Sequence, residues 1–169
     1  VAPSRGLGDV YKRQIMLGVE NGYAIGKDIE NITRFRKMGV SYITLCHNGS
    51  NDICDSARGD AEWNGLSPFG KEVVRKMNET GVLVDISHAA ESTFYDALET
   101  STYPIIASHS SARALCNHPR NLTDEQLKAL AEQGGVAQIC LYKGFINEDA
   151  EKASLSDAIR HIDHIVDLI

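Results

Sequence analysis

The stretch VLVDISHAAESTFYDALETSTYPIIASHSSAR, residues 82–113, decides the fold of this chain. It contains two short apolar runs, VLVDIS and PIIAS, separated by a segment of helical character near 91–100. A strand, a helix and a second strand in this order form the βαβ unit of a parallel sheet. The first run stops on His88 and the second on His109. The stretch therefore predicts two parallel strands, each of which ends on a histidine, a side chain that can bind a metal ion.

The same alternation of strands and helices extends in both directions from this unit. Further apolar runs occur at 15–19, 41–46 and 136–141, and helical patterns occur near 26–38, 67–81, 123–133 and 156–169. Ser67-Pro68 should start the second of these helices, and Thr123 and Gln126 have capping-box spacing at the start of the third. The last helix should carry His161 on a polar flank and an apolar stripe made of Leu155, Ile159, Ile162, Val166 and Ile169. A doubly wound sheet would hold five strands, but the GxGxxG turn that usually follows its first strand is absent. We therefore predict an α/β fold, a partial (β/α)8 barrel. A whole barrel typically needs about 250 residues, so about five of its eight strands would be present.

The first fourteen residues, VAPSRGLGDVYKRQ, share no periodicity with the rest and resemble translated sequencing-adapter read-through. We predict that 1–14 is a non-native segment and that 15–169 is the partial barrel domain. This interpretation implies that the natural N-terminus is missing, so the sequence leaves cytoplasm and export equally open. We expect a bacterial source.

Composition narrows the class of partner. The chain has 169 residues, of which 43% are hydrophobic, and a formal net charge of −6. It can bury one globular core, and its acidic balance argues against a nucleic-acid-binding surface. No run reaches the ~18 apolar residues of a membrane-spanning helix. The four cysteines form no CxxC pair, which argues against a zinc knuckle or a disulfide scaffold. A small-molecule partner is expected, and the oligomeric state stays open, with a homodimer as one option.

Four successive predicted strands each end on one ionisable residue: Glu20, His47, His88 and His109. Strand alternation places His88 on the face of Val84 and His109 on that of Ile105, and it points Asp85 toward the helices. In an α/β barrel, the carboxyl ends of the strands form the active site. We therefore expect these four side chains to converge on one pocket.

A glutamate with two or three histidines is a ligand set that zinc accepts. Zinc lowers the pKa of a bound water to about 7, which makes hydrolysis the natural reaction class. One histidine at a strand end is more often structural than a ligand, but four such placements are harder to attribute to chance.

The motifs DISH, SHSSARAL and HPRNLTDE, in this order, are highly specific in combination. With them, the chain from residue 15 to 169 resembles the membrane dipeptidase (renal dipeptidase) family of zinc peptidases. The resemblance implies a two-zinc site at which a water or hydroxide shared by the metals attacks the peptide carbonyl of a dipeptide.

The resemblance also implies a role for each matching residue. Glu20 would bridge the two zinc ions, and His88 and His109 would complete one of the two zinc sites. His47 would be no ligand but would stabilise the oxyanion of the substrate carbonyl, and Arg120 would hold the terminal carboxylate of the dipeptide.

Two parts of the family pattern have no match in this sequence. A His-x-Asp pair on the first strand of the family, for the other zinc, would lie before Ile15, and a late-strand aspartate that protonates the leaving amine would lie beyond Ile169. We therefore expect this chain to be inactive alone. Two rivals stay open: another metal-dependent amidohydrolase or lactonase on the same barrel, and a non-catalytic binding domain.

Overall fold

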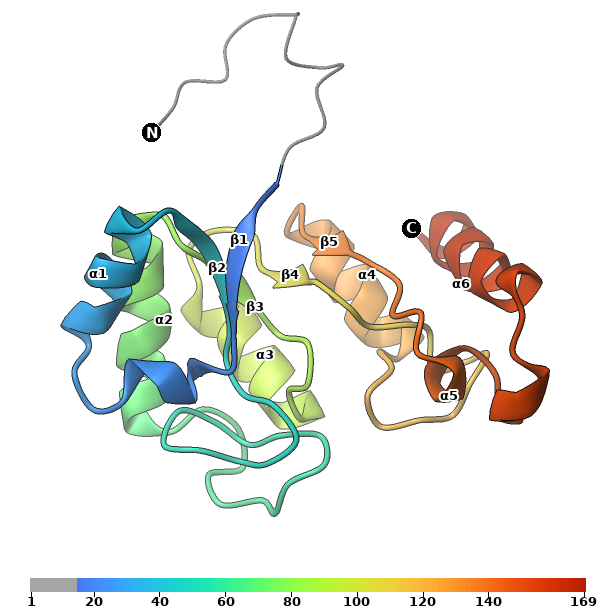
Figure 1. Cartoon of the computed structure of the whole chain (residues 1–169), viewed down its shortest axis with the longest axis horizontal. Coiled ribbons are helices and arrows are strands. Elements are labelled where there is room, and N and C mark those ends of the chain that lie inside the picture. The colour runs from blue at the N-terminus through green and yellow to red at the C-terminus, as the bar shows by residue number, and fades with distance from the viewer. Residues whose placement is uncertain (1–14) are drawn as a thin grey trace, which may run out of the picture.

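A computed structural model describes residues 15–169 and contains one five-stranded parallel sheet (Figure 1). The strands are β1 (Leu17–Glu20), β2 (Val40–Thr44), β3 (Leu83–Asp85), β4 (Ile106–Ala107) and β5 (Val136–Ala137). Their order in the sheet is their order in the chain, and every neighbouring pair is parallel. This is the strand arrangement of an α/β barrel, and it confirms the predicted fold class.

The helices differ in how they begin, because a side chain caps the first turn of some of them and not of others. They are η2 (Gly22–Ile25), α1 (Glu30–Lys37), α2 (Pro68–Thr80), α3 (Glu91–Thr100), α4 (Asp124–Glu132), α5 (Lys143–Ile146), η3 (Ala150–Lys152) and α6 (Leu155–Leu168). The Ser67 hydroxyl caps α2, and α2 ends at Gly81 in the left-handed conformation, with φ 70°. Thr123 and Gln126 form the expected capping box of α4.

The two faces of the sheet differ in burial. One face is buried by helices at the inner strands: Ile43, Val84 and Ile105 lie in one core with residues of α1, α2, α3 and α4. On the other face the half-buried Tyr42 and Leu83 line an open hollow of about 360 Å³. The helices thus lie outside the curve of the sheet, and the hollow lies where the interior of a barrel would be.

The C-terminal strand is shorter than predicted. The predicted strand 136–141 is regular only over Val136–Ala137. Single backbone hydrogen bonds continue the pairing, from the N–H of Gln138 to the carbonyl of Ala107 (2.8 Å) and from the N–H of Ser110 to the carbonyl of Gln138 (2.8 Å). The chain beyond the regular ladder therefore still runs beside its neighbour.

Helix α6 presents its apolar stripe to solvent. The residues predicted as the apolar stripe of this helix are all exposed: Leu155, Ile159, Ile162, Val166 and Ile169. The buried face instead carries Ala158, His161 and Ile165, and it contacts α4 and α5. The helical periodicity placed this helix correctly. The face that packs against the other described residues, however, is not the apolar face that was expected to be buried.

Two further expectations concern the first fourteen residues and a membrane-spanning helix. The prediction that 1–14 is non-native lies outside them and stays a prediction. Among residues 15–169, no helix combines the length and apolar character needed to cross a bilayer.

Candidate metal and substrate site

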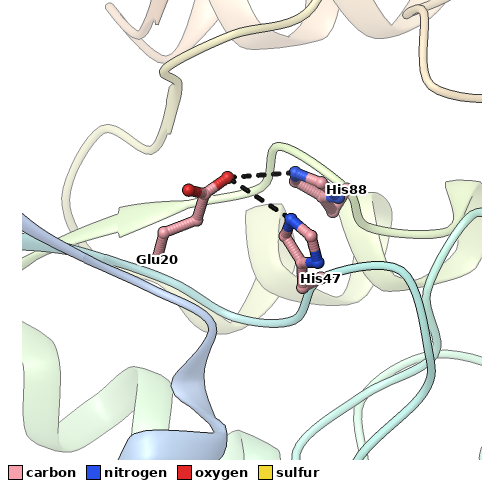
Figure 2. A group of neighbouring side chains, drawn as sticks. All are labelled: Glu20, His47 and His88. Carbon is pink, nitrogen blue, oxygen red and sulfur yellow. Dashed lines mark hydrogen bonds and ion pairs between the residues drawn. The ribbon is translucent and has the colours of Figure 1, made fainter.

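The side chains that follow four neighbouring strands meet around one carboxylate oxygen. Glu20 Oε1 lies 3.2 Å from Nε2 of His88, 3.3 Å from Nε2 of His109 and 3.7 Å from Nε2 of His47. Figure 2 shows the Glu20 carboxylate pointing at the imidazoles of His47 and His88. The four residues predicted to converge are therefore close together.

The imidazole rings also contact one another. The ring centroids of His47 and His88 are 4.1 Å apart, and those of His88 and His109 are 4.9 Å apart with the rings edge to face. Ligand atoms of Glu20, His47 and His88 all lie within 4.8 Å of one another. His47 is therefore near enough to share a cation with Glu20, although the resemblance gave it another role.

The route by which His88 reaches the site differs from the predicted one. Strand β3 ends at Asp85, and His88 has a left-handed backbone with φ 72°, so strand alternation does not extend to it. The prediction that Asp85 points toward the helices is wrong for the same reason. Its carboxylate bonds Ser108, which lines the hollow on the concave face. A non-glycine residue in this conformation costs about 1–3 kcal/mol and is typical of functional sites.

The long loop between β2 and α2 folds back onto the strand ends. The hydroxyl of Ser56 donates to the carbonyl of His47 (2.5 Å), and the N–H of Ala57 donates to the carbonyl of His88 (2.8 Å). Within the loop, the buried carboxylate of Asp55 accepts hydrogen bonds from the backbone N–H groups of Glu62, Trp63 and Gly65. The loop therefore ties together the backbones of two of the clustered histidines.

Burial keeps two of the imidazoles neutral. It lowers the pKa of His88 to about 3, with the positive charge of Arg120 as the next cause. Burial also lowers the pKa of His109, although the nearby Asp85 and Glu20 carboxylates oppose the shift. A neutral imidazole has one nitrogen lone pair available, which is the form that binds a metal ion.

The donor set fits a divalent transition metal. One carboxylate oxygen surrounded by three imidazole nitrogens is a set that zinc accepts. Where an imidazole turns the lone pair of its Nε2 toward Glu20 Oε1, the two lone pairs repel each other, and a cation between the two atoms would replace that repulsion by two attractive contacts. The residues present therefore suit a metal, with Glu20, His88, His109 and His47 as the available ligands.

Arg120 is a buried guanidinium without an anionic partner among residues 15–169. Its side chain is 4% exposed, its Nε has no hydrogen-bond partner, and its guanidinium lies 5.5 Å from the ring centre of Phe145. Burial lowers its pKa, whereas Asp85 and Glu20 are among the groups that raise it. An unpaired buried charge is costly, so this position is suited to an anionic ligand.

Helix α6 contributes one further buried histidine to the region behind the site. His161 was expected on a polar flank of the last helix, but it is fully buried. Its Nδ1 accepts from the N–H of Ala112 (3.0 Å), and its Nε2 lies 3.1 Å from the carbonyl of Ile146. His161 therefore joins α6 to the segment that follows His109. Because His161 lies opposite the apolar stripe of the helix, the sequence pattern did not indicate that it is buried.

Comparison with known proteins gives a consistent family. The sequence profile described as membrane dipeptidase (peptidase family M19) matches residues 7–169. An uncharacterized dipeptidase of Schizosaccharomyces pombe is 38% identical over 154 residues, which are 90% of this chain and 38% of the relative. Dipeptidase tcpJ of Claviceps purpurea is 38% identical over 151 residues, 89% of this chain and 36% of the relative.

Solved structures agree with the sequence comparisons. An amidohydrolase from Pseudomonas aeruginosa has a TM-score of 0.83 at 28% identity and covers 89% of this chain and 46% of its own. A metallo peptidase from Rhodobacter sphaeroides, liganded with a phosphinate mimic of the dipeptide L-Ala-D-Ala, has a TM-score of 0.82 at 26% identity. The chain thus spans less than half the length of these relatives.

Proposed function

Because this chain belongs to the membrane dipeptidase family, we propose that it carries part of the active site of a zinc-dependent dipeptidase. The observation that carries this proposal is the convergence of Glu20 with His88, His109 and His47 at the ends of neighbouring strands. The substrate class is a dipeptide, and the reaction is hydrolysis of its peptide bond.

In this proposal Glu20, His88 and His109 hold the metal. His88 is 7% exposed and His109 28%, against 41% for His47, so the two deeper imidazoles suit a fixed ligand role. When bound, zinc supplies a Lewis acid that polarises a carbonyl and lowers the pKa of a water molecule to about 7. The neutral state of both imidazoles at neutral pH supports this assignment.

His47 and Arg120 would act on the substrate. An N–H of the more exposed His47 would donate to the carbonyl oxygen of the dipeptide and stabilise the negative charge that develops on it. The planar guanidinium of Arg120 would bind the terminal carboxylate through two parallel hydrogen bonds. Its burial without an anionic partner among the described residues supports this role.

The remaining parts of the mechanism are proposed to lie elsewhere in the protein. The family pattern calls for a His-x-Asp pair that completes the second metal site and for an aspartate that protonates the leaving amine. Neither has a match at the corresponding strand in residues 15–169, where the one His-x-Asp sequence, at 161–163, lies on helix α6. The active enzyme would therefore be the full-length protein, within which this chain supplies one metal site and the substrate-binding residues.

Two substitutions in the full-length protein test the division between ligand and substrate residues. His109→Gln should remove bound zinc, measured by elemental analysis after dialysis, together with turnover of Ala-Ala. His47→Gln should leave the zinc content close to wild type and lower kcat by roughly 100-fold, as loss of one oxyanion donor does. Equal loss of zinc in both variants would make His47 a ligand, and a wild-type protein without metal would leave only a non-catalytic binding domain.

A further inference from the structure

The carboxylate of Asp85 joins three strand ends beneath the site. It is fully buried. Its Oδ1 accepts the backbone N–H groups of Ser87 (3.0 Å) and Ser108 (2.9 Å), and its Oδ2 accepts the hydroxyls of Thr44 (2.6 Å) and Ser108 (2.6 Å). An ionised carboxylate can only accept hydrogen bonds and has about four sites for them. Asp85 therefore uses all of its capacity on residues that follow or end β2, β3 and β4.

The bond from Ser108 decides the hydrogen position on His109. The single hydroxyl hydrogen of Ser108 is donated to Asp85, so the Ser108 oxygen can only accept from Nδ1 of His109, which lies 2.7 Å away. Nδ1 of His109 must then carry a hydrogen. In a neutral imidazole this leaves the lone pair on Nε2, the atom that lies 3.3 Å from Glu20 Oε1.

The backbone of His109 is held by the same group of residues. The hydroxyl oxygen of Ser87 accepts the N–H of His109 at 2.9 Å, and the N–H of Ser87 itself donates to Asp85. Both the main chain and the ring of His109 are thus connected to one buried carboxylate.

We propose that Asp85 and Ser108 are positioning residues that fix His109 in its Nδ1–H form and aim its Nε2 at the metal position. The metal half of this inference rests on the proposed function, whereas the hydrogen-bond relay stands on the described contacts alone. Outer partners of this kind fix the orientation of ligating histidines, and their loss typically weakens metal affinity by roughly 10- to 100-fold.

A purely structural role for Asp85 can be separated from the relay because Ser108 makes two bonds to it. Ser108→Ala keeps the bond from the backbone N–H to Asp85 but removes the hydroxyl that contacts His109. Ser108→Thr keeps a hydroxyl and should restore the relay. Ser110→Ala is the matched control, because Ser110 is a buried serine of the same segment whose hydroxyl contacts only Ser87, at 3.4 Å.

The first measurement is the histidine tautomer in the metal-free full-length protein labelled with 15N at its histidines, with His109→Gln assigning the signal. Wild type, Ser108→Thr and Ser110→Ala should show His109 with hydrogen on Nδ1, and Ser108→Ala should show a mixture or the Nε2–H form. The second measurement is Co²⁺ affinity by chelator competition, with circular dichroism confirming the fold of each variant. Ser108→Ala alone should lose about 10-fold or more.

An unchanged tautomer in Ser108→Ala, or an equal loss of Co²⁺ affinity in Ser110→Ala, would overturn the inference. A wild-type protein that has the expected tautomer but binds no Co²⁺ would contradict the proposed function and support the relay alone.

Discussion

Arg120 is the residue whose substitution best separates a dipeptidase from its rivals. In the full-length protein, Arg120→Ala should raise the KM for a free-carboxylate dipeptide by about 30-fold or more, because losing one partner of a buried charged pair costs about 2–5 kcal/mol. The methyl ester of the same dipeptide should be affected little. Steady-state kinetics with both substrates provide the measurement.

Two further variants make the Arg120 result specific. Arg120→Lys keeps the charge but not the two-pronged geometry, so its KM should fall between wild type and Arg120→Ala. Arg75→Ala removes an exposed arginine from α2 and should leave the KM for both substrates unchanged. If Arg120→Ala raises the KM for the ester as much as the KM for the free acid, Arg120 does not bind the carboxylate. An amidohydrolase or lactonase then becomes the better assignment.

At the level of single residues, the sequence could predict which side chains meet but not how each is held. Counting strand ends was enough to bring Glu20, His88 and His109 together, because parallel strands end at one edge of a sheet. The same count misplaced Asp85. A left-handed residue such as His88 breaks the two-residue period, and a non-glycine residue in this conformation leaves no mark in the apolar pattern.

Helix α6 carries a pH-dependent contribution to stability at its first turn. Asp157 accepts hydrogen bonds from Ser154, the N-cap residue, and pairs with Arg160. The Ser154 hydrogen bond is the main cause that lowers the pKa of Asp157 from 3.8 to about 2. A carboxyl with a lowered pKa stabilises the folded state above its ordinary pKa and loses that effect as pH falls toward 2.

Asp157→Asn should therefore unfold at a lower urea concentration than wild type at pH 7. The gap between the two midpoints should close as pH falls from about 4 toward 2. Asp163→Asn removes an exposed carboxylate from the same helix and should change stability by less than about 0.5 kcal/mol at pH 7. A gap that stays constant down to pH 2.5 would show that the charge of Asp157 is not what anchors the helix.

At the level of elements, caps were more informative than apolar stripes. The capping box at Thr123 and the Ser67-Pro68 start located α4 and α2, because these signals depend only on local backbone geometry. Which face of α6 is buried depends instead on what packs against it. The stripe that includes Ile162 and Val166 predicted the wrong face, and the buried one is built around His161.

At the level of the whole molecule, we expect the isolated chain to have no dipeptidase activity of its own. It spans 36–46% of the length of the relatives and solved structures named above, and β1 and β5 each lack a second neighbour among the described residues. We expect the purified 169-residue chain to hydrolyse neither Ala-Ala nor a Gly-X dipeptide when zinc is added. Free amino acids released over hours would be measured by chromatography, with the full-length protein as positive control.

Measurable hydrolysis by the isolated chain would contradict this expectation. It would mean that the residues described here suffice for chemistry, and the proposed contributions of a second metal site and a late aspartate would have to be abandoned.

The identity of strand order and chain order has a consequence for synthesis in the cell. Because each of β2 to β5 pairs with the strand made just before it, a nascent chain can extend the sheet at one growing edge as it leaves the ribosome. Among the described strands, no strand made later has to insert between two strands made earlier. Glu20 emerges first and His109 last of the four clustered residues, so the proposed metal site can form during translation, once the fourth strand has joined.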